Sequence, residues 1–517
     1  MSQNTRTSRF VQNTLSTAAY QLTAMLMGFV TPRLIMLYYG SQVNGLIESV
    51  TEFLTAFRLV EAGLASAAVV SLYKPLAHHD DDATSRIVTA ARQYYNKAGF
   101  LFVGITIAFS LLYPLFIPIE SMSDASVSLL IIAMGISGSL EFFTLSRYRV
   151  LLTADQRTFM VSLASMASLL VSTALIVVCS YLQVNIIVMR LGASLTLVLR
   201  ATILHAYVRK QYPTINAQHP KPDKKPLALR WDAMYQQFTT AFHQVAGGSM
   251  ITLIVRDVTM NSVYSTYHMV TLGLWSVLKM ATTGIYSSFG NLLVDGKEKK
   301  FQVAYRDFEY LYLAASTILF SCAAVLIVPF VVLYTDKIHD ANYFAPAIGL
   351  MIVLETMTDH GKMPMDLMIT AAGVFRETRH HCTAQLITSI VMGLGLGLWG
   401  MQISVTMAIC GILAGVICGN ILRTALHLWF IPKHVTHLPW AQSFWRIVRM
   451  LLEIAVIAVP FLLFFPLRIN GFFKWISLAV PLLIYATTVT LGFGWFFDRE
   501  SLLSLFGRVR YMFQRGR

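Results

Sequence analysis

The run EYLYLAASTILFSCAAVLIVPFVVLY occupies residues 309–334 and carries no charge after Glu309. A helix rises about 1.5 Å per residue, so a run of this length can cross the roughly 30 Å hydrocarbon core of a bilayer. Backbone polar groups find no water in that core, and only helices and closed barrels span it. The run lacks the alternation of apolar and polar residues that is typical of barrel strands. It therefore predicts a transmembrane helix.

The composition extends this prediction to the whole chain. Of the 517 residues, 56% are hydrophobic and 13% are charged, whereas soluble domains carry roughly 25% charged residues. We therefore expect an all-α polytopic membrane protein with about 14 transmembrane helices. The predicted spans are 14–37, 46–72, 95–118, 127–152, 158–181, 184–207, 235–258, 263–291, 309–334, 345–371, 382–399, 404–429, 447–466 and 474–497.

The distribution of positive charge predicts the orientation. With the N-terminus in the cytoplasm, the external loops hold only Lys337, Arg468 and Lys474. Cytoplasmic loops of membrane proteins carry the excess of lysine and arginine. Both termini are therefore expected on the cytoplasmic side of a cytoplasmic membrane. The short external loops argue against an enzyme that polymerises or ligates glycans, because such an enzyme needs a large outer loop for its sugar site. They favour a protein whose chemistry, if it has any, lies inside the helix bundle.

The order of the spans predicts four regions. Residues 1–208 would form an N-terminal lobe of six helices, and 231–430 a C-terminal lobe of six more. The segment RKQYPTINAQHPKPDKKPLALR (209–230) is rich in proline and lysine and is typical of a flexible cytoplasmic linker. Residues 431–517 would add helices 13 and 14 and a basic tail. Two six-helix lobes around a central cavity fit a transporter built from repeats.

Metal, redox and nucleic-acid chemistry find little support in the sequence. The five cysteines lie in or beside apolar runs and form no CxxC motif, which predicts buried thiols. His78 and His79 precede three aspartates, a pattern that predicts a solvated loop rather than a metal site. No phosphate loop is present. The net charge of +14 indicates cytoplasmic loops that face anionic lipid, not nucleic acid.

Charged residues within the predicted spans mark candidate sites, because each costs at least about 2.5–3.5 kcal/mol to insert. In the second span, Arg58 and Glu61 are three residues apart and share a helix face. Arg58 is predicted to bind an anionic group in a wet cavity, since its planar fork meets phosphate oxygens in pairs, with Glu61 positioning it. A self-neutralised pair between helices is the alternative. Glu48 and Glu52 lie nearer the outer rim.

The tenth span carries a stripe of four ionisable residues at spacings of 4, 3 and 4, which places them on one helix face. Such a stripe faces a cavity or a partner helix rather than lipid. It predicts either a site that couples transport to H⁺ or Na⁺, or a structural ladder of salt bridges. Pro364 can break the helix nearby. The residues of the stripe are Glu355, Asp359, Lys362 and Asp366.

Two further cations complete the predicted cavity. Lys279 lies about mid-span in the eighth helix and is the second candidate for binding an anionic cargo. Arg33 follows Pro32 toward the outer end of the first span and is expected to line a vestibule. Arg190 and Arg200 flank the sixth span, and Arg256 and Asp257 are expected at a rim.

Four motifs in register resemble one known family. The segment VEAGLASAAVVSLYKPLAHHDDD (60–82) is similar to the second-helix signature of the bacterial oligosaccharide flippases of the polysaccharide-biosynthesis family. That family lies within the multidrug/oligosaccharidyl-lipid/polysaccharide exporter (MOP) superfamily. The further motifs are RYRVLLTADQRTF (147–159), NSVYSTYHMV (261–270) and TAAGVFRETRH (370–380). The resemblance covers about residues 14–430.

The resemblance implies a function and a set of partners. It implies two six-helix halves that alternate access and flip a polyprenyl-pyrophosphate-linked glycan to the outer leaflet, for cell-surface polysaccharide export. Membrane lipids and proteins of glycan assembly or polymerisation are the implied partners, and no cofactor beyond a coupling ion is implied. Of the cavity cations only Arg58 lies beside a matching motif, just before Val60. Family members often carry an acidic residue near the position of Gly248, so a cation site there is in doubt.

Three other functions remain open from the sequence. A multidrug exporter of the same superfamily would have an anionic cavity for cationic drugs, and this chain carries both signs within its spans. A membrane glycan polymerase or ligase is disfavoured by the short external loops. A scaffold related to flippases would be expected to lose its cavity charges, which are present here.

Overall fold

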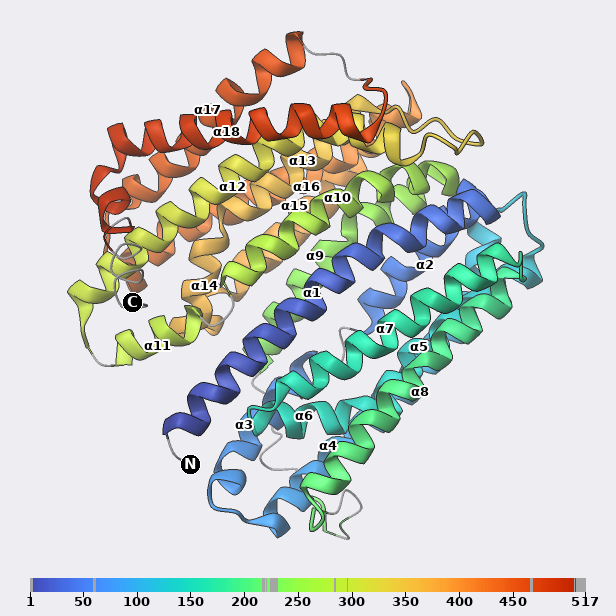
Figure 1. Cartoon of the computed structure of the whole chain (residues 1–517), viewed down its shortest axis with the longest axis vertical. Helices are drawn as coiled ribbons and strands as arrows, with labels where there is room; N and C mark the ends of the chain where they lie inside the picture. Colours follow the sequence, from blue (N-terminus) through green and yellow to red (C-terminus); the bar gives the residue numbers. More distant parts are fainter. Residues whose placement is uncertain are drawn as a thin grey trace. The chain divides into compact units, whose positions relative to one another are not determined.

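The structure is a computed structural model, and it describes residues 3–58, 62–215, 219, 221–223, 231–282, 285–294, 296–464, 468–505 and 507. These residues form helices and connecting segments without a β-strand (Figure 1). Eleven of the helices are long and apolar enough to cross a membrane. Each overlaps a predicted span, so the prediction of an all-α polytopic membrane protein is confirmed. In span 127–152 the helix α5 (Asp124–Leu140) continues through a π-helical turn at Glu141–Leu145 into α6 (Ser146–Ala154).

The other three predicted spans each consist of two successive helices. Span 46–72 corresponds to α2 (Ser41–Arg58) and α3 (Ala62–Ala77), and span 263–291 to α10 (Val258–Thr282) and α11 (Ile285–Val294). Span 345–371 corresponds to α13 (Pro346–Gly361) and α14 (Met363–Ala372). Pro364 lies in the first turn of α14, where its missing N–H costs nothing, whereas within one continuous helix it would remove a hydrogen bond.

The chain divides into two compact units, residues 1–262 and 263–517. The first unit therefore also contains the helix that follows the predicted linker and the start of α10. The four-region division made from the sequence stays a prediction. Besides α2 and α3, the first unit contains α1 (Gln3–Tyr39), α4 (Asp81–Phe116), α5 (Asp124–Leu140), α6 (Ser146–Ala154), α7 (Thr158–Tyr181), α8 (Ile186–Gln211) and α9 (Trp231–Val255).

The acidic run after His79 begins α4. The side chain of Asp80 accepts a hydrogen bond of 2.9 Å from the backbone N–H of Ala83 and so caps the helix. Part of the predicted linker lies against this helix start. Thr214 donates to Asp81 at 2.5 Å, and the backbone N–H of His219 donates to Thr89 at 2.9 Å. The predicted linker thus begins within the last turn of α8 and contacts α4 at Thr214 and His219.

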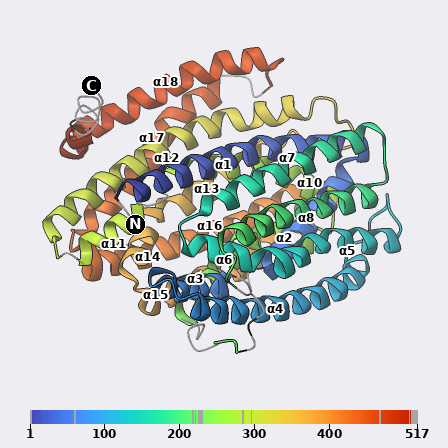
Figure 2. The same cartoon turned by 60° about the horizontal axis from the view of Figure 1, so that its bottom comes forward.

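The second unit is built around α12 (Glu298–Tyr334), the helix that contains the run quoted first. Its companions α17 (Trp440–Phe464) and α18 (Phe472–Phe497) lie along it in both views (Figures 1 and 2). The remaining helices are α15 (Phe375–Met401) and α16 (Val405–Ile431), which ends in a π-helical turn at Pro432–Thr436.

A buried ion network joins α17 and α18 to α12. Arg446 contacts Glu309 at 2.8 Å, and both side chains are only 3% exposed. The same guanidinium contacts Asp498 at 2.5 Å, while Arg449 forms a second ion pair with Asp498. Tyr305 donates to Glu309 at 3.0 Å. The network thus connects α17 and α18 to α12 through buried ion pairs.

The pH dependence of stability follows from Asp498, which lies just beyond the membrane-spanning part of α18. Burial alone would raise the pKa of Asp498, but hydrogen bonds and charge from Arg446 and Arg449 outweigh burial and lower the pKa below its ordinary value. A lowered folded-state pKa contributes stability above about pH 4, and this contribution is lost as the pH falls further. The unfolding temperature of Asp498→Asn in detergent should therefore fall less than that of the wild type between about pH 5 and 3. Identical pH profiles would contradict this role.

Close backbone contact holds α15 to α16. A Cβ added to Gly415 would lie 2.1 Å from the backbone nitrogen of Gly393, and one added to Gly411 would lie 2.4 Å from the carbonyl oxygen of Leu396. Small residues allow helices in a membrane to approach this closely. The close approach brings polar side chains of the two helices within hydrogen-bonding reach.

Candidate functional site

The first predicted site residues fall at the edge of what the structure describes. Arg58 is the last residue of α2, but its side chain lies outside the described residues, as does the whole of Glu61. Their proposed ion pair and its partners therefore stay a prediction.

Arg33 and Lys279 have described positions. Arg33 is half-buried on α1 in the first unit. Lys279 is exposed near the end of α10 in the second unit, where its ammonium lies 4.2 Å from the ring centre of Trp275. Such cation–π contacts orient an ammonium without neutralising its charge.

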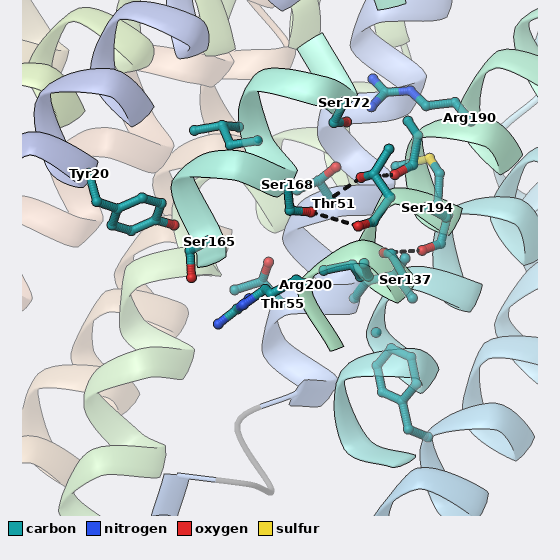
Figure 3. A pocket seen from close by; sticks show the side chains of 18 residues that line it. Tyr20, Thr51, Thr55, Ser137, Ser165, Ser168, Ser172, Arg190, Ser194 and Arg200 are labelled. Carbon is teal, nitrogen blue, oxygen red and sulfur yellow. Dashed lines mark hydrogen bonds between the residues drawn. The ribbon is translucent and has the colours of Figure 1, made fainter. Parts of the chain in front are cut away.

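The first unit contains a cavity of about 320 Å³ between α1, α2, α4, α5, α7 and α8 (Figure 3). Its lining combines two arginines with many hydroxyl groups, an arrangement typical of sites for hydroxylated or anionic ligands. Arg190 lies toward Ser172, and Arg200 lies toward Thr55 (Figure 3). The polar lining residues are Tyr20, Thr51, Thr55, Ser137, Ser165, Ser168, Ser172, Arg190, Ser194, Thr196 and Arg200.

The two cavity arginines differ in their partners. Arg200 lies 3.9 Å from Glu141, a carboxylate that also contacts Arg149 at 3.8 Å. Arg190 forms no hydrogen bond or ion pair with a described residue, and its Nε is buried. Among the described residues, the negative charge of Glu48 on α2 is the one that favours the Arg190 cation. Because a buried cation needs compensation, Arg190 is the group in this cavity most suited to an incoming anion.

The cavity is not among the sites predicted from the sequence, in which Arg190 and Arg200 flank the sixth span. A usable signal was present in the fifth span, where Ser165, Ser168 and Ser172 follow one another at spacings of 3 and 4 and so line one face of an otherwise apolar helix. The cavity lies against that face.

Gly248 lies directly against a carboxylate. A Cβ added at Gly248 on α9 would lie 1.9 Å from Oε1 of Glu52 on α2. The Oε2 atom of Glu52 is buried and has no hydrogen-bond partner among the described residues. The position at which the resembled family often carries an acidic residue is thus glycine here, and a carboxylate from the neighbouring helix fills the space beside it.

This contact predicts a coupled pair of substitutions. Gly248→Ala should lower the free energy of unfolding by about 1–3 kcal/mol, because the added methyl group overpacks the α2–α9 contact. Glu52→Ala removes the obstructing carboxylate, so the double variant should recover most of the loss. Thermal unfolding in detergent measures all three proteins. Additive effects of the two substitutions would show that Glu52 does not occupy this space.

The stripe of the tenth span is divided by the break between α13 and α14. Lys362 lies at the break and forms an ion pair with Asp359. Asp366 instead contacts Arg423 on α16 at 2.5 Å. Glu355 lies on α13, where its backbone carbonyl accepts a hydrogen bond of 3.3 Å from Asn420. The four residues therefore take part in separate contacts of one polar region.

Five residues of α15 and α16 complete this region, and the sequence reasoning named none of them. Arg423 donates to Gln385 at 2.7 Å, and Gln385 donates to Asn420 at 2.7 Å. His427 lies between Asp366 and His381. Asn420, Arg423 and His427 show the same kind of pattern as the stripe. They are 3 and 4 residues apart in an apolar span and therefore share one helix face.

Comparisons with known proteins place the fold. No family model matches the sequence, and a search of curated proteins finds no match. Among solved structures, an inward-facing multidrug resistance MATE family transporter of the MOP superfamily has a TM-score of 0.64 at 12% identity, covering 84% of this chain and 98% of that one. The lipid II flippase MurJ in an inward closed conformation has a TM-score of 0.62 at 11% identity, covering 93% and 98%.

A third solved structure is similar in fold. It is a MOP superfamily transporter from Pyrococcus furiosus described by the reverse polarity of its binding pocket, with a TM-score of 0.58 at 11% identity over 86% of this chain and 96% of that one. Identities of 11–12% show the fold alone. The chain is thus a multi-pass membrane protein with the fold of the MOP-superfamily transporters.

Proposed function

We propose that this protein is a transporter that moves a polyprenyl-pyrophosphate-linked oligosaccharide from the inner to the outer leaflet of the cytoplasmic membrane. It does so by alternating access, with both termini in the cytoplasm, and serves cell-surface polysaccharide export. The observation that carries the proposal is the cavity with two arginines and many hydroxyls in a chain with a transporter fold. The four motifs resembling oligosaccharide flippases support the cargo class.

The chemistry of the lining suits each part of such a cargo. A pyrophosphate that crosses hydrocarbon unaided loses its hydration at a prohibitive cost. Arg190 supplies a charge with no ion-pair partner among the described residues, and a guanidinium meets phosphate oxygens in pairs. The serine and threonine hydroxyls both donate and accept hydrogen bonds, as sugar hydroxyls require. Membrane lipids surround the exposed apolar helix faces, and proteins of glycan assembly are the expected partners.

A cation-coupled multidrug exporter is the second candidate. One observation favours it, namely the buried carboxylate of Glu52 beside Gly248, which could attract a cation. Two arginines in the cavity of the same unit oppose it, because like charges repel a cationic drug. The proposal of an anionic cargo is therefore preferred.

The two candidates differ in a transport assay. The wild-type protein in proteoliposomes is given a fluorescent polyprenyl-pyrophosphate oligosaccharide in one arm and a cationic dye in the other. The proposal expects the glycolipid to reach the opposite leaflet and the dye to stay. Transport of the dye alone would replace the flippase function with drug export. Transport of neither would overturn both.

A further inference from the structure

A buried hydrogen-bonded chain runs from α15 through α16 to α14 in the second unit. The Nδ1 atoms of His381 and His427 lie 2.9 Å apart, and Nε2 of His427 lies 3.0 Å from Oδ1 of Asp366. His427 is fully buried, whereas His381 is 6% exposed and the Asp366 side chain is 20% exposed. The chain therefore has a fully buried middle, and its two ends at His381 and Asp366 are less deeply buried.

His427 faces conflicting partners. Its Nε2 atom lies 3.0 Å from Nε of Arg423, which is always a donor, and 3.0 Å from Oδ1 of Asp366, which accepts when ionised. One ring nitrogen cannot accept from the first and donate to the second at the same time. On the other side of the ring, the two Nδ1 atoms face each other at 2.9 Å, and they form a hydrogen bond when one of them carries a hydrogen and the other does not. The geometry thus allows two arrangements of hydrogens.

In the first arrangement, Nε2 of His427 accepts from Arg423, and its Nδ1–H donates to His381. In the second, Nε2–H of His427 donates to Asp366, and Nδ1 accepts from the Nδ1–H of His381. The second arrangement leaves Nε2 of His381 with a lone pair, and this atom has no hydrogen-bond partner among the described residues. It is the point at which water can deliver a proton.

A proton that enters at Nε2 of His381 converts the second arrangement into the first. His381 becomes an imidazolium and passes its Nδ1 proton to Nδ1 of His427. His427 then passes its Nε2 proton to Oδ1 of Asp366, and its freed lone pair accepts from Arg423. One proton has moved from water to the carboxyl group, no bond between heavy atoms is made or broken, and the total charge rises by one unit. Arg423, which also contacts Oδ1 of Asp366 at 2.5 Å, then faces a neutral acid instead of a carboxylate.

The surrounding charges have opposite effects on protonation of the two histidines. Asp366 attracts a proton toward the histidines, while Arg423 opposes a second one because it stays charged at any accessible pH. Arg423 is also held by Gln385 at 2.7 Å. His434, in the π-helical turn after α16, stacks on the ring of Phe430. The charged residue Arg446 of α17 forms its ion pairs with α12 and with Asp498 after α18. The groups acting on the histidines or on Arg423 are Asp359, Lys362, Asp366, His380 and Cys382.

We propose that His381 and His427 form a proton relay that carries a proton between water and Asp366, and that this proton is the coupling ion of transport. The second part rests on the function proposed above. Proton transfer changes whether Arg423 or Asp366 is bound to His427, and so changes how α16 is held to α14. A relay that ends on Asp366, which joins α14 to α16, can bias how these two helices are arranged.

The relay itself is tested without cargo. Protein labelled with nitrogen-15 at its histidines is examined by NMR in lipid between about pH 5 and 8. The wild type should show one strongly hydrogen-bonded imidazole proton coupled to two Nδ1 atoms, and its signals should titrate. His427→Gln and His381→Gln should each remove this proton, while His380→Gln on the exposed neighbour should keep it. Absence of the shared proton in the wild type, or its survival in both variants, would overturn the relay.

Coupling is tested by imposing a proton gradient across proteoliposomes that contain the polyprenyl-pyrophosphate oligosaccharide. The gradient should accelerate transport by the wild type and by His380→Gln, and it should not accelerate transport by His381→Gln. Equal acceleration in His381→Gln would overturn the coupling role. If the wild type moves no cargo while the shared proton is present and titrates, the proposed function fails and the relay stands.

Discussion

Replacing Arg190 with glutamine is expected to slow transport of the pyrophosphate-linked cargo by about 10- to 100-fold. The magnitude follows from the loss of one charged hydrogen-bonding group, worth about 1.5–3 kcal/mol. The unfolding temperature should stay unchanged or rise, since Arg190 forms no ion pair with a described residue and its Nε is buried without a partner. Initial rates in proteoliposomes and thermal unfolding in detergent measure the two effects separately.

Arg149→Gln is the matched control for this prediction. Arg149 is an exposed arginine that contacts Glu141 at 3.8 Å and does not line the cavity. Its loss changes the net charge by the same amount but should leave transport within about two-fold. Equal losses in both variants would mean that the total charge of the protein, rather than the cavity, determines transport.

Arg446→Met is expected to have the largest effect on stability. Removing one partner of a buried ion pair leaves the other charge uncompensated and costs about 3–5 kcal/mol. Here Glu309 would keep only hydrogen bonds from Tyr305 and Ser443, and Asp498 would keep Arg449. The variant should therefore unfold at a markedly lower temperature, with α17 and α18 losing their attachment to α12.

Arg306→Met provides the comparison for Arg446→Met. Arg306 also lies on α12, but its ion pair with Glu500 at 2.7 Å is solvent-accessible. Exposed pairs contribute about 0–1 kcal/mol, so this variant should remain close to the wild type. Similar destabilisation by both substitutions would show that the burial of Arg446 does not determine its contribution.

The positions of the long apolar helices could be predicted from the sequence, but the breaks between shorter helices could not. Length and hydropathy are local properties, so runs such as 309–334 were found directly and their helices lie where they were predicted. Where a predicted span divides into two helices depends on single residues and on what surrounds them in the fold. Pro364 was named as a possible break, but only the structure shows that the chain divides at Lys362 into two helices.

The outcome for the candidate sites differs because side-chain partners depend on packing. Glu309 is the first residue of a predicted span, and Arg446 and Asp498 lie one residue outside two others. None of the three therefore stands out as a charge within the membrane. Their contact depends on how α12, α17 and α18 pack. Asp366 was found as a charge within a span, but its partners lie 57 and 61 residues away in sequence. A single sequence does not show which distant residues will meet.

The central claim is that the cavity of the first unit holds the anionic head of the cargo, and site-directed labelling tests it most directly. Ser172→Cys is introduced on the cavity lining in a chain whose five native cysteines are replaced. A short polyprenyl-pyrophosphate glycan should slow modification of this thiol by a small reagent, and the protection should be lost when Arg190→Gln is added. A neutral analogue without the pyrophosphate should give little protection. Equal labelling with and without the pyrophosphate, or protection by a cationic dye instead, would contradict the account.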